Sequence, residues 1–184
     1  MLKPAYPDFI IGVDLGFKGA FAVIGVDGRQ PRLLKDMPTK KIKVGSKTRS
    51  KLELKDLKDV LQMVRKFYKN FVLVIEKTSP IGSRRVTSQA NWNLGYAEGA
   101  LTGLCLGMKI PYYFARPKAW QQHFNITGKH RGEEAPSYAV AKDRFPNEEL
   151  ATKRGAILDG RSDALLIGLY ALEALVAGGT LDSL

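Results

Sequence analysis

Four carboxylates in this chain stand beside apolar segments, where an acid needs a positive partner. Asp14 follows an apolar run of strand type, and Glu76 ends a second such run. Asp159 and Asp163 stand at the start of an apolar stretch with helical spacing. Burial of an acid costs free energy unless a positive group compensates its charge. Two divalent cations would provide that compensation, and pairs of metal ions are the usual catalysts of phosphodiester hydrolysis.

Each acid also has a simpler explanation when it is taken alone. Asp14 is compatible with a turn residue, and Glu76 with an ion pair to a nearby lysine. Asp159 is compatible with a helix N-cap, and Asp163 with an exposed acid that interacts with the helix dipole. The combination favours one shared site, because the two strand acids become neighbours if their strands are adjacent, and acids four residues apart share a helix face. Without metal, four clustered carboxylates would repel one another.

The elements that must position these acids follow from the apolar periodicity. It predicts strands at residues 9–14, 20–26, 32–37, 71–76 and 110–114, and helices at residues 52–68, 91–108, 117–124, 134–145 and 160–177. Three hairpin-linked strands followed by strands separated by helices predict an α/β fold, a mixed five-stranded sheet with helices on both faces. The length of 184 residues predicts a single domain, residues 1–184.

The chain is strongly basic, with a net charge of +11. Such a charge favours a polyanionic partner, most commonly nucleic acid. Residues 39–51 predict an exposed loop, and residues 40–51 within it carry six Lys or Arg and no acid. We expect this loop to supply non-specific affinity for the DNA backbone through Lys40, Lys41 and Lys43. A solvated loop far from DNA is the alternative.

The predicted helix 91–108 contains four glycines spaced by four. Each costs about 1 kcal/mol relative to alanine inside a helix, so the close approach of another backbone is expected to compensate. Packing on the sheet of the same chain and a subunit interface both satisfy this expectation. The glycines are Gly95, Gly99, Gly103 and Gly107.

The single cysteine and the ends of the chain bear on the compartment. Cys105 excludes an internal disulfide, fits a reducing compartment and lies in an apolar run that predicts a core position. The N-terminal segment lacks the apolar core of a signal peptide, and no apolar stretch has the length of a membrane span. We therefore expect a soluble intracellular protein in the cytoplasm or nucleoid of a bacterium or phage-infected host, or in an organelle.

The acidic segments resemble, in order and spacing, the active-site blocks of the RuvC-type Holliday junction resolvases. Five segments carry the likeness: residues 11–20, 74–76, 93–100, 114–120 and 159–165. The resemblance implies the ribonuclease H-like fold and a homodimer that acts in DNA recombination and repair. It also implies paired, symmetric cleavage of four-way DNA junctions, which leaves 5′-phosphate and 3′-hydroxyl ends.

The resemblance also assigns roles to individual residues. Asp14 would bridge two Mg²⁺ or Mn²⁺ ions in each active site, Glu76 would hold one ion, and Asp159 and Asp163 would complete the ligand set. Ligands that are all oxygen atoms suit these cations rather than zinc. The further candidates for contact with DNA phosphates are Arg84, Arg85, Lys118, Lys153 and Arg154.

Two departures from the bacterial members concern the last acidic segment. Its two acids stand four residues apart rather than three, as in phage-like and organellar members. The histidine that some members carry beside these acids is absent, and Ser162 stands between the acids instead. The resemblance therefore does not extend to proton transfer by a histidine.

Three other functions compete with a junction resolvase. Residues 12–16 also resemble the first phosphate loop of the actin and sugar-kinase ATPase superfamily, which needs two such domains where this chain has room for one. A non-catalytic junction-binding or ribosome-associated protein would be expected to lack some of the four acids. Another ribonuclease H-like nuclease, one that cleaves RNA–DNA hybrids, would carry the same acids and can be distinguished only by its substrate.

Overall fold

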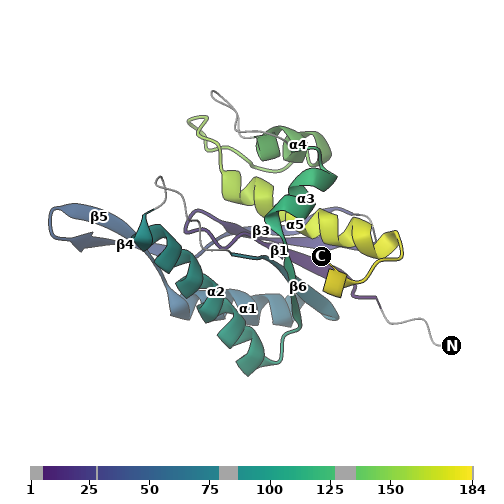
Figure 1. Ribbon diagram of the computed structural model, residues 1–184, viewed down its shortest axis with the longest axis horizontal. Helices are drawn as coiled ribbons and strands as arrows, with labels where there is room; N and C mark the ends of the chain where they lie inside the picture. The colour runs from purple at the N-terminus through teal and green to yellow at the C-terminus, as the bar shows by residue number, and fades with distance from the viewer. Residues whose placement is uncertain (1–5, 28, 79–86, 127–135, 184) are drawn as a thin grey trace.

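A mixed five-stranded sheet lies at the centre of the molecule (Figure 1). The structure is a computed structural model, and it describes residues 6–27, 29–78, 87–126 and 136–183. The strands follow the order β3-β2-β1-β6-β7, antiparallel from β3 to β1 and parallel from β1 to β7. Their bounds are β1 Phe9–Val13, β2 Ala20–Gly25, β3 Pro31–Asp36, β6 Phe71–Glu76 and β7 Tyr112–Ala115. All five predicted strands are confirmed, with small shifts at their ends.

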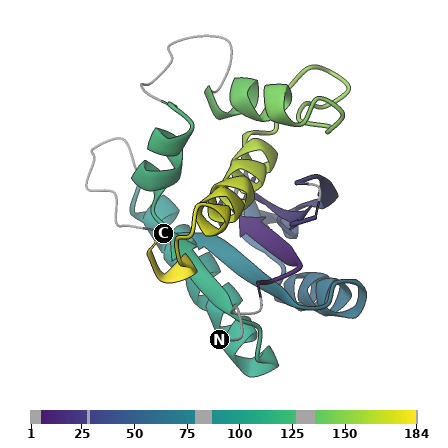
Figure 2. The same cartoon turned by 90° about the vertical axis from the view of Figure 1, so that its right-hand side faces the viewer.

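Helices cover both faces of this sheet, as predicted (Figure 2). On one face, apolar residues of α1 and α2 form a core cluster with Ile11 and Val13 of β1. On the other face, α3, α4 and α5 form a second cluster with Ile10. The alternation along β1 is that of a strand buried on both faces. The helix bounds are α1 Leu54–Phe67, α2 Ser88–Met108, α3 Pro117–His123, α4 Pro136–Arg144 and α5 Asp159–Val176, with a short 3-10 helix, η1, at Leu181–Ser183.

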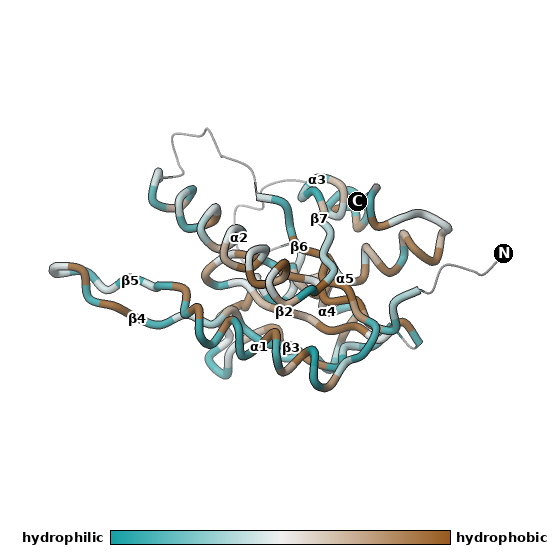
Figure 3. Tube along the Cα trace, turned by 90° about the horizontal axis from the view of Figure 1, so that it is seen from below, coloured by the Kyte–Doolittle hydropathy of each residue, from teal (hydrophilic) through white to brown (hydrophobic). Residues whose placement is uncertain are grey.

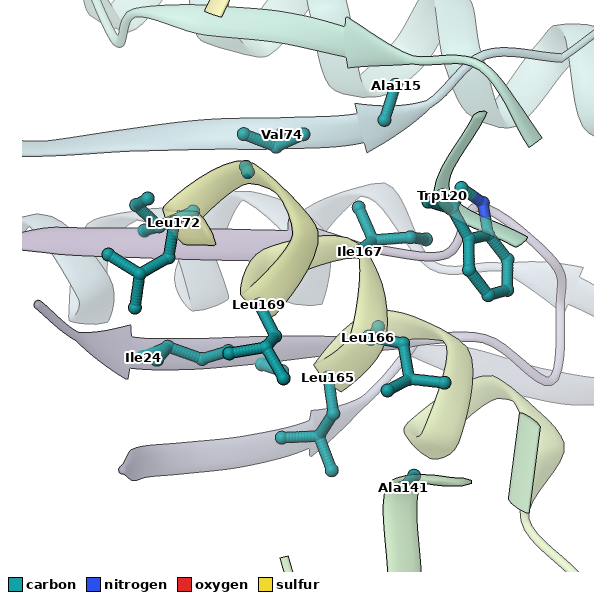
Figure 4. Packing of buried hydrophobic residues seen from close by; sticks show 14 of the residues in the cluster. Ile24, Val74, Ala115, Trp120, Ala141, Leu165, Leu166, Ile167, Leu169 and Leu172 are labelled. Atoms are coloured by element: carbon teal, nitrogen blue, oxygen red, sulfur yellow. The ribbon is translucent and has the colours of Figure 1, made fainter. Parts of the chain in front are cut away.

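Helix α5 is the centre of the second cluster and contacts β1 and β2 along its length. Leu165, Leu169 and Leu172 pack toward Ile24 of β2 (Figure 4). The helix can approach β1 closely because residue 12 is glycine: a Cβ atom there would lie 2.0 Å from the carbonyl oxygen of Ala164. This close crossing fixes the position of α5 along β1, and so places the first turn of the helix beside the end of the strand.

Helix α2 begins three residues earlier than predicted, at Ser88. The cause is a capping interaction, in which the side chain of Thr87 accepts a hydrogen bond of 3.2 Å from the amide of Ala90. Cys105 in this helix is fully buried, which confirms its predicted core position, and burial raises the pKa of its thiol to about 12. No helix within the described ranges has the length and apolarity needed to cross a membrane.

The prediction of a loop over residues 39–51 is wrong. The segment forms a hairpin of β4 Thr39–Val44 and β5 Lys47–Leu52, which projects beyond the body of the molecule (Figures 1 and 3). Its turn contains Gly45 with a φ of +61°, a conformation that glycine adopts without strain. The β-branched residues between the lysines favour a strand. The expectation that the segment is exposed is confirmed for most of its residues.

Candidate active site

The strand register makes Asp14 and Glu76 neighbours. Val13 of β1 pairs with Ile75 of β6 in parallel register, so the next residue on each strand is one of these acids. The carboxylate of Asp14 also accepts a hydrogen bond of 2.9 Å from the amide of Gly16, which holds it at the start of the β1–β2 turn. The predicted adjacency of the two strand acids is confirmed.

A contact between two glycines brings α5 to these acids. Gly19, which ends the β1–β2 turn, forms a bridge with Gly160 in the first turn of α5. A Cβ atom on Gly160 would lie 2.2 Å from the carbonyl oxygen of Lys18, so only glycine permits this approach. Asp159 is the first residue of α5, and the N-cap is Leu158. The alternative of an N-cap role for Asp159 is therefore wrong.

The four acids interact electrostatically across these elements. Burial and the charge of Asp14 raise the pKa of Glu76 to about 7, and Asp163 contributes further. Burial, with the charges of Asp14 and Asp159, also raises the pKa of Asp163 to about 7. The pKa of Asp14 is raised by burial and by Asp159, although the bond from Gly16 opposes the change. The structure thus gathers all four predicted acids around one site.

The chemistry of this site fits a divalent cation. Atom Oδ1 of Asp163 is buried, and within the part of the chain that the structure describes it has no hydrogen-bond partner. A buried acceptor of this kind is costly unless a donor or cation occupies it. Among the described residues, no three acids, histidines or cysteines stand close enough to share one ion. Repulsion keeps carboxylates apart when no cation lies between them, and the side chain of Asp159 is exposed.

Two residues that the sequence did not single out position these acids. The indole of Trp120, in α3, is buried and donates a hydrogen bond of 3.0 Å to Oε1 of Glu76. Ser137, in α4, is buried close to Asp163 and acts to lower the pKa of that acid. The only sequence signal for Trp120 is its place in the family-like segment 114–120. Nothing in the sequence marks Ser137.

Arg161 fixes the first turn of α5 on the edge of the sheet. Its guanidinium donates to both carboxylate oxygens of Asp36, at 2.6 and 3.0 Å, and to the carbonyl oxygen of Glu149 at 2.8 Å. Such two-pronged pairs fix orientation as well as distance. Since Arg161 stands between Asp159 and Asp163 in sequence, this anchor holds the helical turn that carries both acids.

The chain that leaves Glu76 is attached to α2 through Glu98. Lys77 forms an ion pair of 2.8 Å with Glu98 and lies 4.1 Å from the ring centroid of Phe114. The amide and hydroxyl of Thr78 donate to the same carboxylate. Although burial opposes it, these hydrogen bonds lower the pKa of Glu98. Lys77, the lysine next to Glu76, therefore pairs with Glu98. The simpler explanation, an ion pair between Glu76 and this lysine, does not apply.

The basic residues predicted to contact DNA lie on several separate elements. Lys40, Lys41 and Lys43 are exposed on β4, where Lys40 pairs with Glu53 and Lys41 donates to Ser50 at 2.9 Å. The other described candidates are exposed: Lys118 in the first turn of α3, and Lys153 and Arg154 between the bridged residues Ala151 and Ile157. Arg84 and Arg85 lie outside the described residues. The role of all these residues stays a prediction.

Comparison with known proteins gives a fold match from structure alone. No protein-family model and no curated protein sequence matches the chain. The fold is similar to that of Thermus thermophilus RuvC in complex with a Holliday junction substrate, with a TM-score of 0.61, 15% identity, and coverage of 92% of this chain and 96% of that chain.

Two further solved structures agree. A second Thermus thermophilus RuvC structure gives a TM-score of 0.53 at 14% identity, over 92% of this chain and 96% of that one. The yeast mitochondrial Holliday junction resolvase Ydc2 gives 0.51 at 15% identity, over 96% of this chain and 83% of that one. The chain therefore has the ribonuclease H-like fold of the RuvC-type Holliday junction resolvases, a fold shared with an organellar member.

Proposed function

We propose that this chain is a metal-dependent endonuclease that resolves four-way DNA junctions, and that residues 1–184 act as one nuclease domain. The observation that carries the proposal is the joining of four mutually repelling, half-buried or exposed carboxylates from β1, β6 and α5. A protein gains nothing in stability from such a cluster. Its retention at the edge of a resolvase fold supports a catalytic role.

The acids would hold Mg²⁺ or Mn²⁺, two ions per site. Asp14 would bridge the ions, Glu76 would hold one of them, and Asp159 and Asp163 would complete the set. When bound, the ions supply Lewis acidity and neutralise charge on the phosphodiester, as in-line displacement requires. Trp120 keeps Glu76 in place through its hydrogen bond, and partners of this kind commonly tune metal affinity.

Helix α2 supports the proposal of a homodimer. Each of its four spaced glycines is exposed, and a Cβ atom built on any of them has no described atom within 4 Å apart from its chain neighbours and the nearby backbone of the helix itself. The alternative that these glycines pack on the sheet of the same chain is therefore wrong. Ala97, Leu101 and Cys105 are the buried residues of the helix. The glycine face is open for a second copy, and a two-fold dimer matches a substrate that needs two symmetric cuts.

The competing functions have less support. The described part of the chain contains one five-stranded sheet, whereas an ATPase of the actin and sugar-kinase type closes two such domains on its nucleotide. A non-catalytic junction-binding protein has no need of four carboxylates. A hybrid-cleaving nuclease stays the second candidate, because its acids would be arranged in the same way.

One experiment separates these functions. Labelled four-way junction, duplex DNA and RNA–DNA hybrid of the same sequence are incubated with the protein in Mg²⁺, Mn²⁺ or EDTA. We expect paired cuts at symmetric positions in the junction with either metal, no cuts in EDTA, and little cleavage of the other substrates. Preferred cleavage of the hybrid would assign the second function, and binding without cleavage in any metal would assign the non-catalytic one.

A further inference from the structure

An apolar groove lies between the projecting hairpin and the first half of α2. Its volume is about 580 Å³, within the range of small-ligand pockets. Ile42 and Val44 of β4 form one wall, and Trp92 and Tyr96 of α2 form another, while Phe17 lines it from the β1–β2 turn. We name this feature the hairpin groove.

The aromatic wall of the groove is rigid and accessible. The rings of Trp92 and Tyr96 stack with centroids 5.1 Å apart and planes only 8° from parallel. This contact fixes the orientation of both side chains, yet 61% of the surface of Trp92 remains exposed. An exposed tryptophan held in a fixed orientation offers a flat surface on which another planar group can stack.

Two cationic and three neutral polar residues line the rest of the groove. Arg49 and Lys51 of β5 line it, and Arg49 lies opposite Ile42 in the hairpin register. Arg49 also reaches Gln89 of α2 at 3.4 Å, so hairpin and helix already meet at the rim. No acid is found among the described side chains that line the groove. The surface therefore combines a stacking platform with positive charge, which suits a planar group attached to an anion.

We propose that the hairpin groove binds an unpaired nucleotide of a DNA strand, with the base on Trp92 and the phosphates beside Arg49 and Lys51. Aromatic platforms with adjacent cations are the usual means of binding single strands without sequence preference. Phe17 lines the groove from the β1–β2 turn, three residues after Asp14, so the proposed binding site adjoins the turn that begins at Asp14. This inference rests on the proposed function: it identifies where that nuclease would hold bases that lose their pairing partner.

Intrinsic fluorescence tests the groove directly. The chain has two tryptophans, and Trp120 is buried beside Glu76, so any tryptophan signal that a stacked base quenches comes from Trp92. Oligothymidylate, a closed DNA hairpin duplex and a four-way junction are each titrated into the protein in EDTA. We expect oligothymidylate to quench the Trp92 emission, and the duplex to bind without comparable quenching.

Matched variants separate stacking from charge and folding. Trp92→Ala should weaken oligothymidylate binding on the order of tenfold and leave duplex binding unchanged, whereas Trp92→Phe should keep most of the affinity. Phe67→Ala is the control, because Phe67 is an aromatic residue of α1 with a similar exposure of 66%. It should bind all three probes as the wild type does.

Several results would overturn the inference. They are wild-type affinity of Trp92→Ala for oligothymidylate, absence of quenching, and a change in oligomeric state of Trp92→Ala by light scattering, which would place a second copy in the groove. Junction cleavage in Mg²⁺ is measured in parallel. Cleavage without quenching refutes the groove alone, and quenching without cleavage refutes the resolvase while the groove stands.

Discussion

Removal of the charge of Asp163 is expected to abolish cleavage and yet to stabilise the metal-free protein. Its pKa is about 7 in the folded protein, against an ordinary value of 3.8. At a pH between these two pKa values, Asp163 is protonated in the folded protein and ionised in the unfolded chain. The contribution of Asp163 to stability therefore falls as the pH rises from about 4 to about 7.

The two pKa values give the size of the effect. A tenfold change in proton affinity corresponds to about 1.4 kcal/mol, so the full penalty at pH 8 is about 4 kcal/mol. We expect Asp163→Asn to raise the free energy of unfolding in EDTA at pH 8 by on the order of 3 kcal/mol. The gain is less than the penalty because the buried amide needs hydrogen-bond partners of its own. At pH 5 the penalty is smaller by about 3 kcal/mol, so little of the gain should remain.

Urea unfolding, followed by circular dichroism in EDTA at pH 5 and pH 8, measures both values. Asp143→Asn, which removes an exposed acid of α4, is the control and should change little at either pH. Addition of Mg²⁺ should stabilise the wild type more than Asp163→Asn, because binding to the folded state adds to its stability. The reasoning is refuted if Asp163→Asn is no more stable than the wild type at pH 8, or if its gain is equal at the two pH values.

Four other outcomes are expected. Amide replacement of any of the four acids should abolish junction cleavage and leave junction binding in EDTA intact, as a gel-shift assay can show. Trp120→Phe, which removes the donor to Glu76, should slow cleavage about 10- to 100-fold and raise the Mg²⁺ concentration needed for half-maximal rate. Gly103→Leu meets open space within the chain, so it should fold normally but scatter light as a monomer. Glutamine at Lys40, Lys41 and Lys43 should reduce the salt dependence of junction binding by about 0.9 in log–log slope for each DNA phosphate that the protein no longer neutralises, with the cleavage rate of saturated complex unchanged.

The central sheet and the acids could be predicted because local patterns determine them. Apolar runs mark β1 and β6, and two parallel strands that both end in an acid need only the correct register to place Asp14 beside Glu76. The four-residue spacing then puts Asp159 and Asp163 on one face of α5. Each step of this prediction depends only on residues close in sequence or on the pairing of two strands.

The parts that could not be predicted depend on contacts between distant segments. The effect of Ser137 on the pKa of Asp163 and the pairing of Arg161 with Asp36 exist only after α4 and β3 pack around α5. The hairpin of residues 39–52 differs from the prediction for another reason. Its lysines suggest a solvated loop, although Ile42 and Val44 alternate with them as strand residues do.

The bridge between Gly19 and Gly160 also determines when the carboxylate site is completed during biosynthesis. The two halves of the carboxylate cluster are joined by a contact between segments about 140 residues apart, and α5 leaves the ribosome after β1 and β6. Until it docks, Asp14 and Glu76 have no partners from α5, and the apolar face of β1 and β2 is uncovered. Under the proposed function, the site would therefore be completed only when α5 docks, and a chain whose α5 has not yet docked would not cut DNA.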